Sequence, residues 1–282
     1  MTHTPQGALL WEPSSDRVHA SGLYTFTTWV NEHYGAGVTD YHALWRWSVD
    51  DIARFWEAIW VHYNVVASQP YSEVLRAKTM PGARWFVGAK LNLAEYLLKQ
   101  GDLEDPNRTA IFAQGESSEP RHISWVELRD QVARFATYLR GAGVGRGDRV
   151  VAYLPASIEA VVGMLASISI GAIWSSCSPD FGAKGVLERF QQISPKVLLT
   201  VTGYRYNGKT FDRTAEVRAI VDALPSIEQV IHLPWLDSEQ TGDANLPSHR
   251  RVVDWGRALS TAASYGDFRF EQVDFAHPVW IL

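Results

Sequence analysis

Short apolar runs and helical spacings alternate along the second half of the chain. Between residues 149 and 233, apolar runs are separated by segments whose apolar residues recur every three or four positions. The runs are DRVVAYL, AIWSSCS, KVLLTV and QVIHL. Because each run is apolar at successive positions, we expect strands buried on both faces, as in a mostly parallel sheet covered by helices. The pattern therefore predicts an α/β fold.

The segment before this alternation predicts a hairpin and a capped helix. The runs TAIFAQ and RHIS flank the polar stretch GESSEP, which is typical of a β-hairpin. Ser124 and Glu127 have the spacing of a capping box, and apolar residues follow at helical spacing as far as Leu139. The sequence LEDPNR breaks the preceding pattern, so we place a domain boundary near Gly101. The predicted domains are an N-terminal extension, residues 1–100, and an α/β part, residues 101–282.

The N-terminal extension is predicted to be mainly helical and rich in aromatic residues. Its first part, about 40 residues, has no clean period. Ser48 is then a candidate N-cap with Asp51 in the capping-box position, and Trp47 and Ile52 occupy the hydrophobic-staple positions. The apolar stripe of this predicted helix consists of Ile52, Phe55, Trp56, Ile59, Trp60 and Tyr63. Such a stripe serves a partner surface or core packing, and core packing is the commoner use.

Two local signals follow this helix. Pro81-Gly82 predicts a turn. Asn92 stands directly before Leu93, Tyr96 and Leu97, which have helical spacing, so we expect Asn92 to cap a helix.

One long stretch without charge tests whether the chain is a membrane protein. Residues 160–179, AVVGMLASISIGAIWSSCSP, carry no charged side chain. A membrane-spanning helix needs roughly 20 predominantly apolar residues, and this stretch is interrupted by Gly171 and ends in serines. We therefore expect a buried helix followed by a buried strand.

Composition excludes some functions. The 282 residues carry a formal net charge of −5, which gives no general attraction for nucleic acid or for an anionic membrane. The one cysteine, Cys177, rules out an intramolecular disulfide and suits a reducing compartment. The N-terminal sequence has no basic segment followed by an apolar core, so we expect no secretory signal and a cytoplasmic location.

Familiar catalytic motifs are absent from the sequence. The run GAGVGRGD lacks the third glycine of a dinucleotide fingerprint in either register and follows a predicted helix, so we interpret it as a helix end and loop. Neither G-x-x-x-x-G-K-[ST] nor G-x-S-x-G occurs, and the histidines show no metal-binding spacing. Cys177 is a conceivable nucleophile, but a small buried side chain is the commoner role of a free cysteine.

Two predicted loops are candidates for ligand binding because they follow strands. Open α/β sheets bind ligands at the carboxyl ends of their strands. The segment GYRYNGKTFD follows KVLLTV and offers Arg205 and Lys209 on either side of a tight turn at Asn207-Gly208. Two cations on such a loop can hold a phosphate, although a solvated loop explains the same residues. The segment CSPDFG follows the preceding strand and could line the same crevice.

Taken together, these motifs resemble those of a known family. The segments RWSVDDIARFWEAIW, MPGARWFVGAKLNLAEYLL, SWVELRDQVARFATYLRGAGVGRGDRVVAYLP, GAIWSSCSPDFG and YRYNGKTFD are similar, in the same order, to acyl-adenylate-forming ligases of the acetyl-CoA synthetase branch. The segment IWSSCSPDFG resembles the acetoacetate–CoA ligases of that branch. The resemblance spans most of the chain. It implies the first subdomain of the large adenylate-forming domain, preceded by the family's N-terminal extension.

The resemblance also implies substrates, cofactors and site residues. The family uses ATP and Mg²⁺ to convert a carboxylate to an acyl-adenylate, from which the thiol of coenzyme A then displaces AMP. By resemblance, Arg205 and Lys209 match basic positions that contact the 3′-phosphate end of coenzyme A. Pro179, Asp180 and Phe181 fall where relatives line its adenine, although relatives carry Gly-Gly where this chain has Pro-Asp.

The resemblance further implies that PVWIL leads into the family's phosphate loop, so we expect the chain to stop before that loop. We accordingly expect no catalytic residue and no metal ligand within it, and an isolated chain that is inactive. Three interpretations stay open. The chain is part of an acetoacetate–CoA ligase, part of a ligase of the same branch for another short-chain acid, or a non-catalytic module that binds coenzyme A or a partner. We expect small-molecule substrates in the first two.

Overall fold

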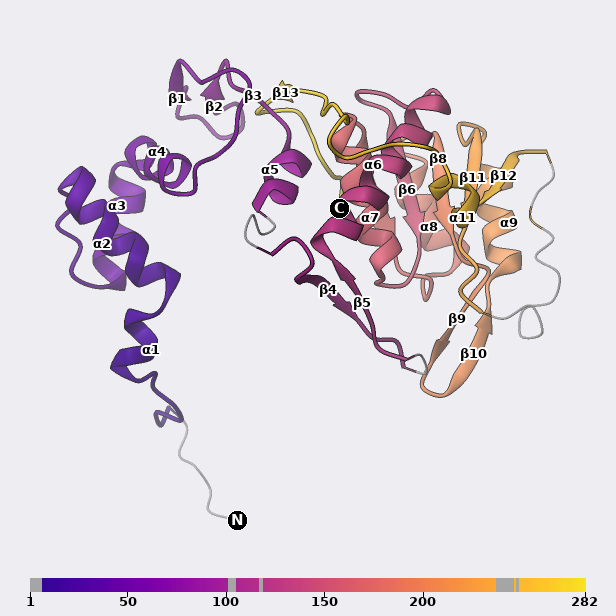
Figure 1. Ribbon diagram of the computed structural model, residues 1–282, viewed down its shortest axis with the longest axis horizontal. Helices are drawn as coiled ribbons and strands as arrows, with labels where there is room; N and C mark the ends of the chain where they lie inside the picture. Colours follow the sequence, from indigo (N-terminus) through magenta and orange to yellow (C-terminus); the bar gives the residue numbers. More distant parts are fainter. Residues whose placement is uncertain (1–6, 101–104, 117–118, 237–245, 247–248) are drawn as a thin grey trace, which may run out of the picture. The chain divides into compact units, whose positions relative to one another are not determined.

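The structure, a computed structural model, describes residues 7–100, 105–116, 119–236, 246 and 249–282 (Figure 1). It divides into two compact units. Unit 1 comprises Met1–Val65 and Tyr71–Val87, and unit 2 comprises Val66–Pro70 and Gly88–Leu282. The boundary predicted near Gly101 falls on residues 101–104, outside the described residues, and stays a prediction.

Unit 1 contains helices and one antiparallel hairpin. Its helices are α1 (Ser15–His19), α2 (Gly22–Tyr34), α3 (Tyr41–Asp50) and α4 (Ile52–His62). Each begins after a residue whose side chain accepts a backbone hydrogen bond of the first turn, which is the usual role of Ser and Asp at an N-cap. The hairpin pairs β1 (Glu73–Arg76) with β2 (Arg84–Val87), and the predicted turn at Pro81-Gly82 lies between them.

The structure corrects the sequence prediction for the start of α4. Ser48 is not an N-cap but lies inside α3, where its hydroxyl donates to the carbonyl oxygen of Trp45 at 2.7 Å. The cap is Asp51, whose side chain accepts from the backbone N–H of Arg54 at 3.3 Å. Two helices meet at Asp51, and Trp47 therefore belongs to the earlier helix rather than to a staple. The helices before residue 41 were not predicted, because they bury few residues and therefore leave a weak apolar period.

The predicted aromatic stripe of α4 packs partly inside unit 1. The Phe55 ring lies edge-on to Phe26, with centroids 6.1 Å apart, and the Trp60 ring lies 4.5 Å from that of Phe86. The buried core beneath consists of Phe26, Val30, Val38, Leu44 and Ala58. Trp56 and Tyr63 stay substantially exposed, so the stripe is only partly used in packing.

Unit 2 is built on a five-stranded parallel sheet. Its strands are β6 (Arg149–Tyr153), β7 (Ile173–Cys177), β8 (Val197–Thr200), β11 (Gln229–His232) and β12 (Arg251–Asp254). They are ordered β12-β11-β8-β6-β7 and every neighbouring pair is parallel, which confirms the predicted sheet. β12 was not predicted, because it follows the polar stretch that begins at residue 237.

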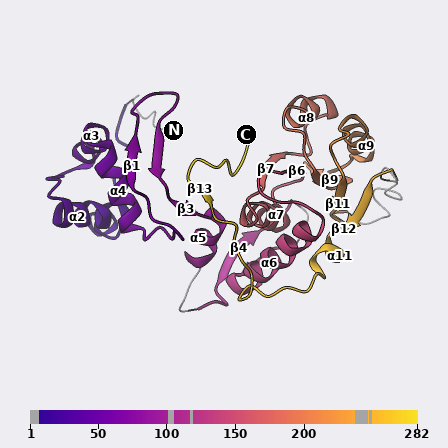
Figure 2. The ribbon, with the colours of Figure 1, turned by 90° about the horizontal axis from the view of Figure 1, so that it is seen from above.

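Helices cover both faces of this sheet (Figure 2). One face carries α6 (Trp125–Gly141), α7 (Ile158–Ser169) and α11 (Trp255–Leu259), and the other carries α8 (Ala183–Phe190) and α9 (Thr214–Ala223). Two clusters of buried apolar residues correspond to these faces. The fold class is therefore the predicted one: a helical N-terminal part followed by a parallel sheet between layers of helices.

The predicted capping box and the buried helix expected from the charge-free stretch are both present. The Ser124 N–H donates to Glu127 Oε2 at 2.9 Å, and the Glu127 N–H donates to Ser124 Oγ at 3.3 Å. The charge-free stretch forms α7, capped by Ser157, and then β7. A Cβ at Gly163 would lie 2.8 Å from Leu199 Cδ2, so the glycine lets α7 approach the sheet closely. Within the described chain, no helix combines the length and apolarity that a bilayer span requires.

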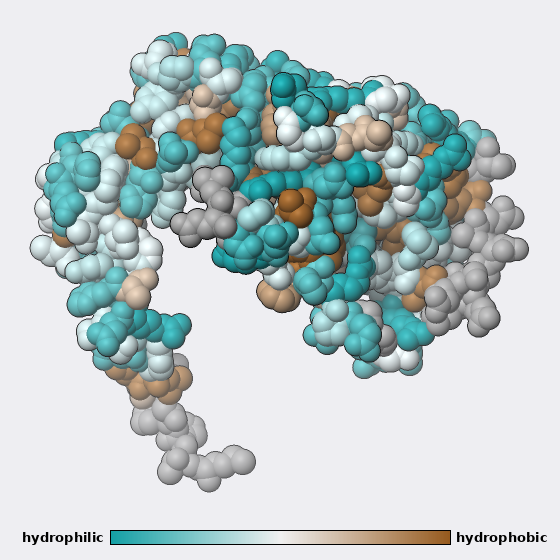
Figure 3. Space-filling model, viewed as in Figure 1, coloured by the Kyte–Doolittle hydropathy of each residue, from teal (hydrophilic) through white to brown (hydrophobic). Residues whose placement is uncertain are grey.

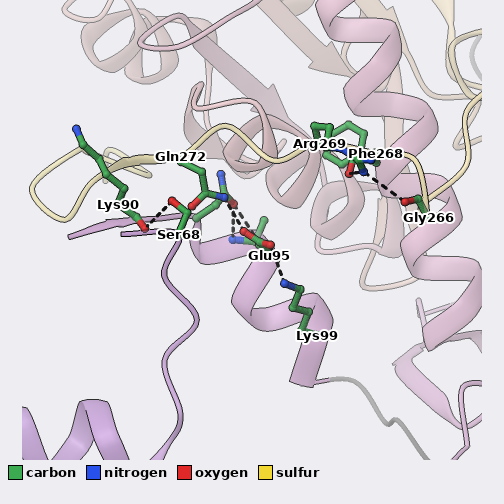
Figure 4. A network of polar contacts seen from close by, with 10 residues as sticks. Ser68, Lys90, Glu95, Lys99, Gly266, Phe268, Arg269 and Gln272 are labelled. Carbon is green, nitrogen blue, oxygen red and sulfur yellow. Dashed lines mark hydrogen bonds and ion pairs between the residues drawn. The ribbon is translucent and has the colours of Figure 1, made fainter. Parts of the chain in front are cut away.

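The last residues of the chain bind α5 (Leu93–Gln100) and the edge of the sheet. Asn92 caps α5, as predicted, and its amide donates to the carbonyl oxygens of Ile168 and Glu271 at 2.9 and 2.8 Å. Figure 4 shows Gln272 on Glu95, a hydrogen bond of 2.7 Å. The segment returns to the sheet as predicted, since the Ile281 N–H donates to the Trp174 carbonyl at 2.8 Å.

The first hairpin of unit 2 pairs β4 (Thr109–Ala113) with β5 (Arg121–Ser124) in antiparallel register, as predicted. A second small pairing joins β3 (Lys90–Leu91) to β13 (Val273–Asp274). The Lys90–Asp274 ion pair, at 2.7 Å, spans this pairing. Backbone and side-chain contacts thus join β3, near the start of the longer segment of unit 2, to β13, near its end.

Candidate functional site

The segment predicted as a strand-end loop is a β-hairpin. It pairs β9 (Gly203–Tyr206) with β10 (Lys209–Asp212) directly after β8. Asn207 and Gly208 form the turn with φ of +49° and +69°. Positive φ at both central residues is the geometry of the type I′ turn, for which Asn-Gly is the preferred sequence. The tight turn predicted from Asn207-Gly208 is therefore present.

The base of this hairpin is anchored in the fold. Tyr204 is buried and stacks on Phe211 with ring centroids 5.2 Å apart. The Arg213 guanidinium lies over both rings, donates to the Tyr204 hydroxyl at 3.2 Å and pairs with Glu216 at 2.7 Å. Aromatic packing, cation–π contact and an ion pair thus fix the base of the hairpin against the start of α9 (Thr214–Ala223).

A cavity of about 340 Å³ opens beside the hairpin. Its walls come from segments that follow strands: residues 113–116 after β4, 155–158 after β6, and 234–236 after β11, together with Arg121, Tyr204 and Arg205. Strands β6 and β8 are neighbours, and the chain leaves them toward α7 and α9, on opposite faces. The cavity therefore lies at a topological switch point of the sheet, where open α/β sheets bind ligands.

The cavity carries charges of both signs. Arg121 Nη2 lies 2.6 Å from Glu159 Oε1, so the charge of this arginine is largely neutralised. The second carboxylate oxygen of Glu159 is buried without a hydrogen-bond partner in the described chain. Arg205 lines the cavity, is exposed, and forms no ion pair with any residue that the structure describes. Arg205 is thus the cation available to an anionic ligand in this cavity.

The two predicted basic residues do not have the same surroundings. Arg205 pairs with Thr210 across the hairpin and lines the cavity, whereas Lys209 pairs with Tyr206 at the turn and is not among the lining residues. Both side chains are exposed. The structure therefore puts Arg205 at the cavity and Lys209 at the tip of the hairpin.

The other predicted segment lies at the end of the neighbouring strand β7. The hydroxyl of Tyr153, the last residue of β6, lies 2.9 Å from the carbonyl oxygen of Pro179 and 2.6 Å from that of Phe181. Burial raises the pKa of this Tyr153 hydroxyl, which keeps it protonated as a donor. Asp180 is exposed, and the Phe181 ring lies under the Arg189 guanidinium at 4.9 Å.

These three residues are held at the same edge of the sheet as the hairpin but do not line the cavity. Tyr153 connects the two regions, because the charges of both Arg213 and Asp180 act on its hydroxyl. The lining of the cavity contains Arg205 but none of Pro179, Asp180 and Phe181. The structure thus brings the predicted residues to one edge without joining them in one pocket.

Several lining residues were not predicted from the sequence. Ser157, Pro234 and Trp235 follow predicted strands, so the rule that ligands bind at strand ends would have found them if applied to every strand. Arg121 and Glu116 belong to the hairpin β4–β5, whose position against the sheet no local pattern reveals.

Cys177 is not among the residues that line the cavity. Cys177 is buried, and burial raises the pKa of its thiol, so it lacks the thiolate character of a nucleophile. Among the described residues, no group of three or more His, Cys, Asp or Glu side chains could hold a metal ion.

Comparison with known proteins gives two family matches. A family model described as AMP-binding enzyme matches residues 99–264, and one described as acetyl-coenzyme A synthetase N-terminus matches residues 41–96. The two matches together follow the order of the predicted N-terminal extension and α/β part.

Individual relatives extend this similarity over nearly the whole chain. The chain is 39% identical over 98% of its length to acetoacetyl-CoA synthetase from Gallus gallus, and 37% identical over 97% to acetoacetyl-coenzyme A synthetase from Rhizobium meliloti. A solved structure, acetoacetyl-CoA synthetase from Streptomyces lividans, covers 97% of the chain with a TM-score of 0.88 and 43% identity. The chain spans 41%, 40% and 41% of the lengths of these three proteins. Since the first family model matches more than half of its residues, the chain belongs to the AMP-binding enzyme family.

Proposed function

We propose that this chain is part of an ATP-dependent acetoacetate–CoA ligase, and that the cavity beside hairpin β9–β10 receives the nucleotide end of coenzyme A. One observation is the basis for assigning the coenzyme A site. Arg205 is a cation without an ion pair among the described residues, and it lines a cavity at the switch point of the sheet. The similarity to acetoacetyl-CoA synthetases over nearly the whole chain supports the reaction.

The proposed reaction has two steps. The carboxylate of acetoacetate attacks the α-phosphorus of ATP, forming acetoacetyl-adenylate and releasing pyrophosphate. The thiolate of coenzyme A then attacks the acyl carbon, forming the thioester and releasing AMP. Such chemistry depends mainly on positioning and charge stabilisation. We assign to this chain a role in holding coenzyme A, and we assign the Mg²⁺ that accompanies ATP to none of its described residues.

Arg205 is the proposed contact to the 3′-phosphate of coenzyme A. Arginine binds phosphate through charge-assisted hydrogen bonds, and the Arg205 guanidinium forms no ion pair with any described residue. Lys209, the first residue after the turn on the same hairpin, is proposed to add a weaker attraction because it lies outside the cavity lining.

Pro179, Asp180 and Phe181 are proposed to border the adenine of coenzyme A. Phe181 is the residue of this segment that can stack on a base, and it is 40% exposed. Arg189 lies over that ring, so a base would either displace this arginine or stack on the remaining face. The Tyr153 hydroxyl keeps the segment in place through the Pro179 and Phe181 carbonyls.

The assignment of Arg205 is tested by replacing it in the full-length protein. Charge-assisted contacts to phosphate contribute about 1.5–3 kcal/mol, so Arg205→Ala should raise the Michaelis constant for coenzyme A by about tenfold or more. It should leave ATP–pyrophosphate exchange with acetoacetate nearly unchanged. The variant should also lose the ability to distinguish coenzyme A from 3′-dephospho-coenzyme A. If both half-reactions fall equally, Arg205 has a structural role instead.

The acid substrate is tested separately from the coenzyme A site. ATP–pyrophosphate exchange is measured with acetoacetate, acetate and other short-chain acids at equal concentration. Fastest exchange with acetoacetate supports the proposal, and fastest exchange with another acid indicates a ligase of the same branch with that substrate. Exchange with none of them would favour a non-catalytic coenzyme A-binding protein. We also propose a cytoplasmic location, which suits the single cysteine and the small soluble substrates.

A further inference from the structure

The tip of hairpin β9–β10 is bonded to a carboxylate from a distant part of the chain. Glu116 Oε1 accepts a hydrogen bond from the Asn207 N–H at 2.8 Å, and Glu116 Oε2 accepts one from the Gly208 N–H at 3.0 Å. Figure 1 shows the ends of hairpins β4–β5 and β9–β10 side by side, and Figure 3 shows a mostly hydrophilic surface where they meet. One side chain thus holds both central amides of the type I′ turn.

This contact is the tether of an otherwise exposed tip. Residues 205–210 are all exposed, in contrast to the buried Tyr204 at the base. Within the part of the chain that the structure describes, no other hydrogen bond joins residues 206–208 to a residue outside the hairpin. Because an isolated two-stranded hairpin is marginally stable in water, the position of the tip depends on Glu116.

Glu116 and Arg205 line the same cavity. Arg205 stands two positions before Asn207, the first residue that Glu116 holds. We propose that Glu116 is a positioning residue, which fixes the hairpin tip so that Arg205 faces the cavity and binds the 3′-phosphate of coenzyme A. This inference rests on the proposed function. Ordering the tip before the ligand arrives removes a cost that binding would otherwise carry.

Because Glu116 is negatively charged, the direction in which coenzyme A affinity changes on its removal identifies its role. A carboxylate in the wall of a cavity that binds phosphate repels the ligand, so removal of this charge alone would tighten binding. Loss of the tether would instead weaken binding, because Arg205 would be held less well. Two short hydrogen bonds from backbone amides engage the carboxylate, and we expect the loss of position to exceed the relief of repulsion.

The test compares three variants of the full-length protein, with coenzyme A and 3′-dephospho-coenzyme A as probes. Glu116→Ala removes both acceptors, and Glu116→Gln keeps one, because an amide has a single acceptor oxygen. Glu119→Gln is the matched control, since Glu119 is an exposed residue of the same connection and makes no hydrogen bond that involves the hairpin tip within the described chain. Each variant is assayed for the Michaelis constant for coenzyme A and for ATP–pyrophosphate exchange.

We expect Glu116→Ala to raise the Michaelis constant for coenzyme A about three- to tenfold, with Glu116→Gln in between, as for the loss of one or two charge-assisted hydrogen bonds at an exposed site. The constant for 3′-dephospho-coenzyme A and the rate of exchange should not change. Hydrogen exchange at the Asn207 and Gly208 amides should accelerate in Glu116→Ala and stay as in the parent protein in Glu119→Gln. A general loss of structure would not produce this selective pattern.

Two results would overturn the inference. One is a Glu116→Ala variant that binds coenzyme A as well as Glu119→Gln does, and the other is a variant that binds it more tightly. The control Arg205→Ala separates this failure from failure of the proposed function. If Arg205→Ala still discriminates against 3′-dephospho-coenzyme A, the phosphate site is wrong and the inference falls with it. If Arg205→Ala loses discrimination while Glu116→Ala keeps it, only the positioning role is wrong.

Discussion

Strand β8 and the hairpin β9–β10 that follows it are held in place in different ways. β8 is buried at every position and hydrogen-bonded to strands on both sides. The hairpin is buried at its first residues and exposed from residue 205 to residue 210, where the carboxylate of Glu116 holds its tip. The comparison teaches that packing fixes the sheet, whereas a few polar contacts fix the residues offered to a ligand. Substitutions in β8 and its neighbours should therefore change stability, and substitutions at the tip should change binding.

The largest expected effect lies where α7 packs on the sheet. Gly163→Val would place a Cβ 2.8 Å from Leu199 Cδ2 and 3.0 Å from Trp174 Cη2, so the helix or the sheet must move. Overpacking of this kind costs about 1–3 kcal/mol or more, and we expect the midpoint of urea unfolding to fall accordingly. Gly145→Ala is the control, because a Cβ there meets nothing within 4 Å. Equal unfolding midpoints for Gly163→Val and Gly145→Ala would show that the contact between α7 and the sheet accommodates the larger side chain without loss of stability.

A smaller effect is expected at the start of α6. Ser124→Ala removes the N-cap and should lower the free energy of unfolding by about 1 kcal/mol at neutral pH. Hydrogen bonds from the Ser124 backbone and side chain lower the pKa of the Glu127 carboxyl in the folded protein. The stabilisation from this group is therefore present above its unfolded pKa of about 4.3 and is lost as the pH falls through the lower folded value.

The pH dependence of the difference in the free energy of unfolding tests this prediction. The difference between the parent protein and Ser124→Ala should shrink as the pH is lowered below about 4, because protonation of Glu127 removes part of the capping box from the parent as well. Urea unfolding at a series of pH values measures it. A difference that stays constant down to the acid unfolding of the parent would mean that Glu127 contributes nothing through its charge.

The smallest effect on stability is expected at the hairpin tip. Lys209 is exposed and forms no ion pair within the described chain, so Lys209→Ala should change the free energy of unfolding by no more than about 0.5 kcal/mol. Its effect on coenzyme A should also be modest, about two- to fivefold in the Michaelis constant, because an exposed charge is screened by salt. The effect should fade at high ionic strength. A clearly destabilised Lys209→Ala variant would contradict the expectation that substitutions at the hairpin tip change binding rather than stability.

Local sequence patterns predicted most of unit 2. The four apolar runs became β6, β7, β8 and β11, and the caps Asn92 and Ser124 start the helices that they were expected to start. These predictions succeeded because burial on both faces leaves a continuous apolar run, and an N-cap acts only on the turn beside it. The first helices of unit 1 were missed and Ser48 was wrongly taken as a cap, because adjoining short helices share one apolar pattern.

The sequence by itself indicated four of the five sheet strands, the caps Asn92 and Ser124 and the turn at Asn207-Gly208, because apolar runs, N-caps and turn residues are signals local to the chain. Only the tertiary structure decided which strand-end residues share a cavity. It placed Arg205 there, left Lys209 and Phe181 outside, and joined Glu116 to a turn 91 positions away. Strand order and the packing of one hairpin on another set these distances, and neither leaves a periodic signal in the residues concerned.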